Sequence, residues 1–156
     1  MIKQQSYTGH TCYVCLVSTT ANLTAGNTIL CPVDFSGNSK KILHWAIVMA
    51  QQLRAHVTVL YAYRLTAVTN VEALQLKRKM EEDAQQRFVQ LERELFSHVA
   101  VSYDFKTEIG FVNDRIEDHT RKNNLSMLVI DKHISHNKEN FDNLLSRIHV
   151  PVILIP

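Results

Sequence analysis

From Thr28 to the end of the chain, short apolar runs alternate with longer segments of mixed polarity. Nearly continuous apolar runs predict buried strands at residues 29–33, 57–63, 125–130 and 150–155. Residues 99–109 place Val99, Val101, Tyr103 and Phe105 on one side and Ser102, Asp104 and Lys106 on the other, which predicts a strand with one solvated face near a sheet edge. The chain therefore offers five candidate strands.

Amphipathic helices are predicted between these runs, because apolar residues recur there every three or four positions. The first helix carries Ile42, Trp45, Ala46, Met49 and Leu53, and the second carries Leu74, Met80, Ala84, Phe88, Leu91 and Leu95. A third follows Gly110, is capped by Asn113 or Asp114 and is anchored by Ile116, and a fourth carries Phe141, Leu144, Leu145 and Ile148. Alternating strands and helices predict an α/β fold, a parallel sheet with helices on its faces.

Residues 1–27 differ from the rest of the chain. They are rich in Thr, Ser, Asn and Gln and show no sustained helical or strand period. We interpret residues 1–27 as an N-terminal extension, either a flexible arm or an added strand, and residues 28–156 as the folded domain.

Composition narrows the classes of function. A net charge of +2 with scattered basic residues predicts no nucleic-acid partner, and no apolar run is long enough to cross a membrane. The chain has three cysteines, an odd number that favours a reducing, cytoplasmic location over a disulfide framework. Cys31 is expected in the core. Cys12 and Cys15 form a C-x-x-C pair without a second pair, so we expect no metal site, although a redox or metal-sensing arm stays open.

Three segments resemble the universal stress protein family. They are Ile29-Leu30-Cys31-Pro32-Val33-Asp34-Phe35-Ser36, then Gly110 with Asp114 and Ile116, and finally Val150-Pro151-Val152-Ile153-Leu154-Ile155. The resemblance implies a five-stranded parallel sheet in the order 3-2-1-4-5, of the adenine nucleotide alpha hydrolase-like type. It also implies an ATP site at the carboxyl ends of strands one and four, with Asp34 against adenine, Pro32 and Val33 nearby, and Ala62 beside the base.

The loop after strand four departs from the ATP-binding members, which carry glycines there. This chain reads Ile130-Asp131-Lys132-His133-Ile134, and no glycine follows Gly110. Glycines let backbone N–H groups approach phosphates at positive φ, and a carboxylate at Asp131 would repel them. We therefore expect no cofactor, with ATP bound weakly at most.

The polar residues of this loop have two interpretations. In the first, Lys132 neutralises Asp34 and Asp131 in a solvated loop. In the second, Asp34, Asp131, Lys132, His133 and His136 bind a small polar ligand or a metal. No acid–base pair or nucleophile with a partner base stands out, so no catalytic residue is predicted.

The last strand suggests self-association. In the order 3-2-1-4-5 it lies at a sheet edge, yet Val152, Ile153, Leu154 and Ile155 are apolar on both faces. Such an edge favours pairing with a second copy. The alternative is that helices cover both faces of the strand and the edge is simply short. The leading hypothesis is a stress-response binding protein that forms a homodimer through these four residues. The alternative is a nucleotide-responsive switch or weak ATPase that binds ATP or AMP through the altered loop.

Overall fold

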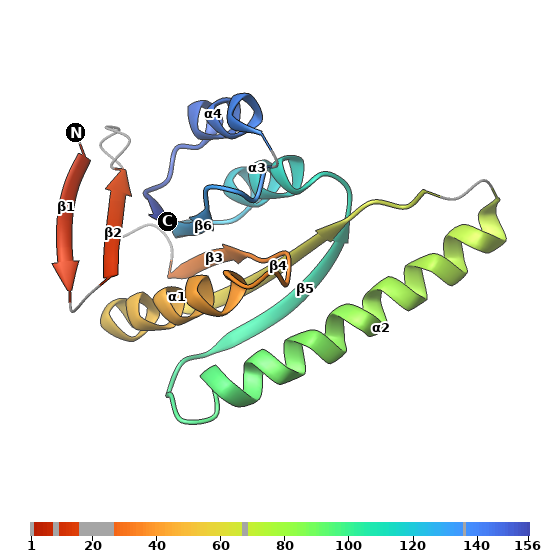
Figure 1. Cartoon of the computed structure of the whole chain (residues 1–156), viewed down its shortest axis with the longest axis horizontal. Coiled ribbons are helices and arrows are strands. Elements are labelled where there is room, and N and C mark those ends of the chain that lie inside the picture. The colour runs from red at the N-terminus through yellow and green to blue at the C-terminus, as the bar shows by residue number, and fades with distance from the viewer. Residues whose placement is uncertain (1, 8–9, 16–26, 67–68, 136) are drawn as a thin grey trace.

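Seven strands form one sheet at the centre of the computed structural model (Figure 1). The structure describes residues 2–7, 10–15, 27–66, 69–135 and 137–156. The strands are β1 (Ile2–Tyr7), β2 (His10–Cys15), β3 (Thr28–Pro32), β4 (His56–Tyr63), β5 (Tyr103–Ile109), β6 (Leu125–Asp131) and β7 (Val152–Ile155). The helices are α1 (Ser39–Leu53), α2 (Asn70–Leu95), α3 (Val112–Lys122) and α4 (Lys138–Arg147).

The five parallel strands have the predicted order. The sheet runs β1-β2-β7-β6-β3-β4-β5, so the strands from β3 onward stand in the order 3-2-1-4-5. Neighbours among these five all pair in parallel. The expected α/β class and strand order are confirmed.

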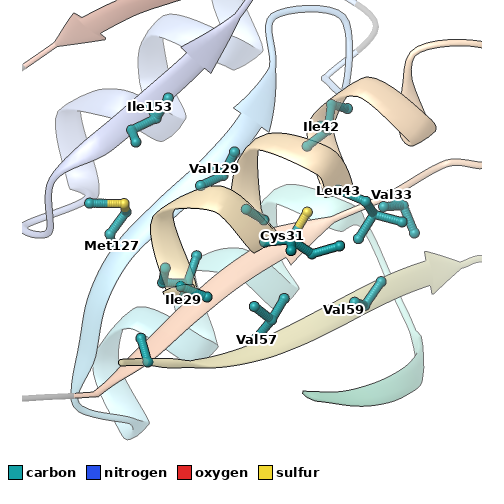
Figure 2. Close-up of a cluster of buried hydrophobic side chains, with 14 of the residues drawn as sticks. Ile29, Cys31, Val33, Ile42, Leu43, Val57, Val59, Met127, Val129 and Ile153 are labelled. Carbon is teal, nitrogen blue, oxygen red and sulfur yellow. The ribbon is translucent and has the colours of Figure 1, made fainter. Parts of the chain in front are cut away.

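Two hydrophobic layers lie on opposite faces of the sheet, because successive strand residues point to opposite sides. Ile29 and Cys31 face the layer under α1 and α2, whereas Leu30 faces the layer under α3 and α4. Figure 2 shows the first layer, where Cys31 lies beneath the α1 residues Ile42 and Leu43. Cys31 is fully buried, which confirms its predicted place in the core, and burial raises the pKa of its thiol well above the usual range.

Helix α2 follows its predicted stripe only in part. Ala84 and Phe88 are buried, and Leu91 and Leu95 pack against the first layer. The prediction for Leu74 is wrong, since this side chain is 52% exposed. The N-terminal part of α2 extends past the parallel strands (Figure 1), so its apolar residues have no layer to join.

Smaller corrections concern the ends of elements. Leu53, the last residue of α1, is 45% exposed rather than part of the buried stripe. Helix α3 begins after Phe111, with no side-chain cap from Asn113 or Asp114, while Ile116 is fully buried as predicted. Strand β5 begins at Tyr103, although Val99 and Val101 still pack on the core.

The edge beside β7 is occupied. Strands β1 and β2 pair with each other in antiparallel fashion, and β2 pairs antiparallel with β7. Our expectation that residues Val152–Ile155 form an open sheet edge is therefore wrong, because the chain supplies the neighbouring strand itself (Figure 1). The outer edge on this side is β1.

No helix in the described ranges is long and apolar enough to cross a membrane.

Candidate functional site

The candidate site lies where β3 and β6 end side by side. These two strands are neighbours in the sheet, and the chain leaves them in opposite directions along the sheet, toward β4 and toward β7. Ligands of open α/β sheets bind outside the carboxyl ends of the strands at such a switch point. The loop from β3 to α1 and the loop from β6 to α4 form the two sides of this site.

Asp34 shapes the first loop. Its Oδ1 accepts hydrogen bonds from the backbone N–H of Ser36 at 2.8 Å and from the hydroxyl of Ser39 at 3.2 Å. Partial burial raises the pKa of Asp34, but the hydrogen bonds from Ser36 and Ser39 outweigh burial, and the net pKa lies below its ordinary value. The carboxylate that the family resemblance places against adenine forms hydrogen bonds here within the turn that leads into α1.

Phe35 adopts a backbone conformation that is unusual for a bulky residue. Its φ is +58°, in the left-handed region, which costs on the order of 1–3 kcal/mol. Its ring packs against Tyr61 and Phe105, with centroid separations of 5.1 and 6.0 Å. These contacts hold the strained turn in place and fill the space next to the end of β4.

Asp131 ends β6 and is only 5% exposed. Its Oδ2 accepts a hydrogen bond from Nδ2 of Asn38 at 2.7 Å. Its Oδ1 accepts from the backbone N–H of His133 at 2.8 Å and lies 3.0 Å from Nδ1 of the same residue. One buried carboxylate therefore joins the start of α1 to the loop after β6.

The loop after β6 also contains two buried residues. Ile134 is 5% exposed and packs in the layer under α3 and α4, and its N–H donates to the carbonyl of Asp131 at 3.2 Å. Ser135 is 4% exposed and donates its hydroxyl to Oδ1 of Asn113 at 2.6 Å. No residue of 131–135 has positive φ, since Phe35 and Arg54 are the only non-glycine examples in the described ranges. The loop follows a path that needs no glycine.

The predicted site residues are only partly brought together. Pro32, Val33 and Ile130 are buried at the strand ends, and Ala62 is half-buried on β4. The interpretation in which Lys132 neutralises two carboxylates is not supported: its side chain is exposed and forms no ion pair among the described residues. His136 lies outside the described residues.

Sequence reasoning missed the role of Asn38. It lies 93 positions before Asp131, and its amide completes the hydrogen bonding of the buried carboxylate. The only hint was its place in the cap-rich stretch before α1.

A metal site is not apparent in the described part of the chain, where no cluster of three or more His, Cys, Asp or Glu residues could hold an ion. The C-x-x-C pair falls on β2.

Comparisons with known proteins agree with this architecture. The structure of the universal stress protein UspA from Lactobacillus plantarum superposes with a TM-score of 0.71 at 19% identity, covering 83% of this chain and 97% of that one. A universal stress protein in complex with cAMP matches at TM-score 0.65 and 13% identity, covering 85% and 98%. One from Archaeoglobus fulgidus matches at 0.57 and 16%, covering 83% and 93%.

At these identities the structures establish the fold alone. A comparison with curated protein sequences finds no match. The family model described as the universal stress protein family matches residues 26–156. On this match over most of its length, the chain belongs to the universal stress protein family.

Proposed function

We propose that this stress-response protein of the universal stress protein type acts by binding and interaction, without catalysis, and that it binds ATP weakly or not at all. The observation that carries the proposal is the buried carboxylate of Asp131 at the end of β6, with its hydrogen bonds to Asn38 and His133.

The backbone amides of the loop support this proposal. A phosphate-binding loop presents free N–H groups to the anion. Here the N–H of His133 donates to the Asp131 carboxylate and the N–H of Ile134 donates to the Asp131 carbonyl. A phosphate at this position would have to displace both hydrogen bonds, and Ile134 would have to leave the core.

The negative charge of Asp131 also weakens the binding of a phosphate group. A carboxylate about 4 Å from a phosphate oxygen repels it by roughly 4 kcal/mol at an effective dielectric constant of 20. At about 1.4 kcal/mol per tenfold change, this term alone weakens binding roughly a thousandfold. Lys132 is exposed and would have to turn inward to offset it.

A nucleotide-responsive switch is the second candidate. Two observations favour it. The family resemblance implies that adenine binds beside Pro32, Val33 and Asp34 at the end of β3, and one of the similar structures is a universal stress protein in complex with cAMP. A cyclic nucleotide carries one phosphate with a single negative charge, so Asp131 repels it less than it repels a triphosphate. This candidate predicts binding of a nucleotide in a manner that depends on Asp34.

Isothermal titration with ATP and with cAMP, each with and without Mg²⁺, separates the two candidates. We expect a dissociation constant for ATP weaker than about 100 μM. Two variants locate any binding: Asp34→Ala removes the carboxylate at the site, and Asp104→Ala removes an aspartate on β5 that pairs with His56 and Lys106.

ATP affinity at low-micromolar concentration or tighter, lost in Asp34→Ala and kept in Asp104→Ala, would refute the proposal. Tight binding of cAMP with the same variant pattern would establish the second candidate instead.

A further inference from the structure

The apolar last strand is paired on both sides within one chain. β6 lies on one side, with Leu128 opposite Val152 and Ile130 opposite Leu154. On the other side, β2 pairs Tyr13 with Leu154, Val14 with Ile153 and Cys15 with Val152. The backbone groups of β7 that would otherwise face outward are therefore covered by the N-terminal hairpin of β1 and β2 (Figure 1).

Without that hairpin, β7 would be an edge of the kind that aggregates or dimerises. Val152 is buried in one hydrophobic layer and Ile153 and Ile155 in the other, each with at most 3% exposure. A strand that is apolar on both faces and has an open row of N–H and C=O groups is a template for another strand. A second copy of β7, antiparallel about a two-fold axis, has the same composition and matches that template.

With the hairpin in place, the edge strand of the sheet is the mostly polar β1 instead of the apolar β7. Its outer strand β1 reads Ile-Lys-Gln-Gln-Ser-Tyr, with one lysine and three further polar residues at its centre. Lysine and polar residues on an edge strand discourage pairing with other chains. The composition of β1 is thus suited to end the sheet, and the composition of β7 is not.

The joint between the hairpin and the sheet is short. β1 and β2 are paired along their whole lengths, from Ile2 with Cys15 to Tyr7 with His10. Within the described part of the chain, the residues of β2 that pair with β7 are 13–15. The hairpin can therefore separate from β7 as a unit while its own two strands stay paired.

From these observations we infer that strands β1 (Ile2–Tyr7) and β2 (His10–Cys15) form an edge cap that competes with a second copy of the chain for β7. In the capped form, β7 is already paired with β2 and cannot dimerise. When the cap leaves, Val152–Ile155 of two copies pair and a dimer forms. This inference does not depend on whether the protein binds nucleotide.

Tethering decides the balance between the two pairings. A segment attached to the same chain acts at an effective concentration on the order of millimolar, whereas a second copy is present at micromolar concentration. For strands of comparable pairing strength, the cap is favoured by about a thousandfold at low-micromolar protein.

Hydrogen exchange of the full chain, read at the peptide that covers residues 150–156 and combined with the mass of the particle in solution, tests the inference. At low-micromolar protein we expect a monomer in which the β7 amides are protected. We expect this protection to be unchanged when the protein is diluted a further tenfold.

The double variant Y13P/V14P breaks the joint. Alternate N–H groups of a strand point to opposite neighbours, so adjacent prolines remove the one directed at β7. We expect the variant to lose β7 protection when dilute, and to regain it as a dimer at hundred-micromolar concentration. The matched control Y13T/V14T changes the same two positions of β2 but keeps both backbone N–H groups, and should stay a monomer with β7 protected.

Two results would overturn the inference. One is a wild-type dimer at low-micromolar concentration whose β7 protection falls on dilution, since that pairing would be between chains. The other is unchanged β7 protection in dilute Y13P/V14P, since β2 would then not be the strand that covers β7.

Discussion

Replacing Asp131 by alanine tests whether its carboxylate supports the fold or is retained for a ligand. Asp131→Ala removes the acceptor of the Asn38 amide and of the His133 N–H, both at 2.7–2.8 Å. Hydrogen bonds to charged groups contribute about 1.5–3 kcal/mol each, and a buried donor left without a partner costs about 1–3 kcal/mol. The contact with the His133 ring adds little, because that side chain is 69% exposed.

A second effect opposes this loss. Removing a buried carboxylate also removes its desolvation cost, which amounts to several kcal/mol for an ion in a protein interior. We expect the two effects to leave a net destabilisation of about 2–3 kcal/mol. Asp131→Asn keeps one oxygen for His133 but places an amide against the Asn38 amide, so it should cost about 1 kcal/mol unless Asn38 rotates.

Urea unfolding followed by the fluorescence of Trp45, the single tryptophan, measures these differences as shifts of the midpoint at constant m. Lys132→Ala is the matched control, since it alters the next residue in the same loop on an exposed side chain and should stay within about 0.5 kcal/mol of wild type. If Asp131→Ala is as stable as this control, or more stable, the structural argument fails. The carboxylate would then be a net burden on the fold, as expected of a group kept for binding.

Two further predictions concern packing and pH. Ile116→Ala, at a fully buried position of α3, should destabilise the protein by about 2–5 kcal/mol in the same urea assay. Leu74→Ala, on the exposed part of α2, should change the free energy of unfolding by less than about 0.5 kcal/mol. Equal effects would contradict the exposure of Leu74. Burial and the hydrogen bond to Glu81 raise the pKa of Tyr63 to about 12, so its neutral form is favoured in the folded state. Its stabilisation is therefore present below pH about 10 and is lost as the pH rises toward 12. In a tyrosinate absorbance titration, Tyr63→Phe should remove the latest-titrating component, and an unchanged late phase would assign it to another tyrosine.

Most of the sheet could be predicted because four of its five parallel strands, β3, β4, β6 and β7, are largely buried on both faces. A strand between two helical layers reads as a continuous apolar run, as in residues 29–33 and 125–130, and such runs are visible without any knowledge of their neighbours. Their order followed from the family resemblance rather than from the pattern itself. The position of Cys31 in the core followed in the same way from its place within such a run.

Periodicity could not show where the sheet ends. Leu74 continues the apolar rhythm of Ala84 and Phe88, but it lies on the part of α2 that extends past the strands. The sequence did not decide between a flexible arm and an added strand for residues 1–27, for a related reason. Strand β1 is mostly polar, so its pairing depends on β2 and, through β2, on an edge that only the folded sheet presents.

The adjacency of the two loops could be predicted, whereas the hydrogen bonds between them could not. Asp34 comes shortly after β3 and Asp131 ends β6, and these two strands are neighbours at the switch point. Whether a carboxylate there faces solvent, a ligand or another side chain depends on residues distant in sequence, and Asn38 gave no local signal of its link to Asp131.

Both features that invite a ligand or a partner in this fold are satisfied from within the chain. At the strand ends, backbone amides that could receive an anion donate to Asp131, and at the sheet edge, the β7 backbone that could receive another strand pairs with β2. In each case the internal partner competes directly with the external one, because a single N–H group cannot donate fully to both. We therefore expect binding at either place to require that the internal contact opens first, which reduces the apparent affinity of any such ligand by the fraction of molecules that are open. The two contacts also differ in extent: the Asp131 carboxylate is buried, whereas the described pairing of β2 with β7 covers residues 13–15 alone. Of the two, the sheet edge is the place where a change in conditions can most readily convert a closed surface into a binding surface.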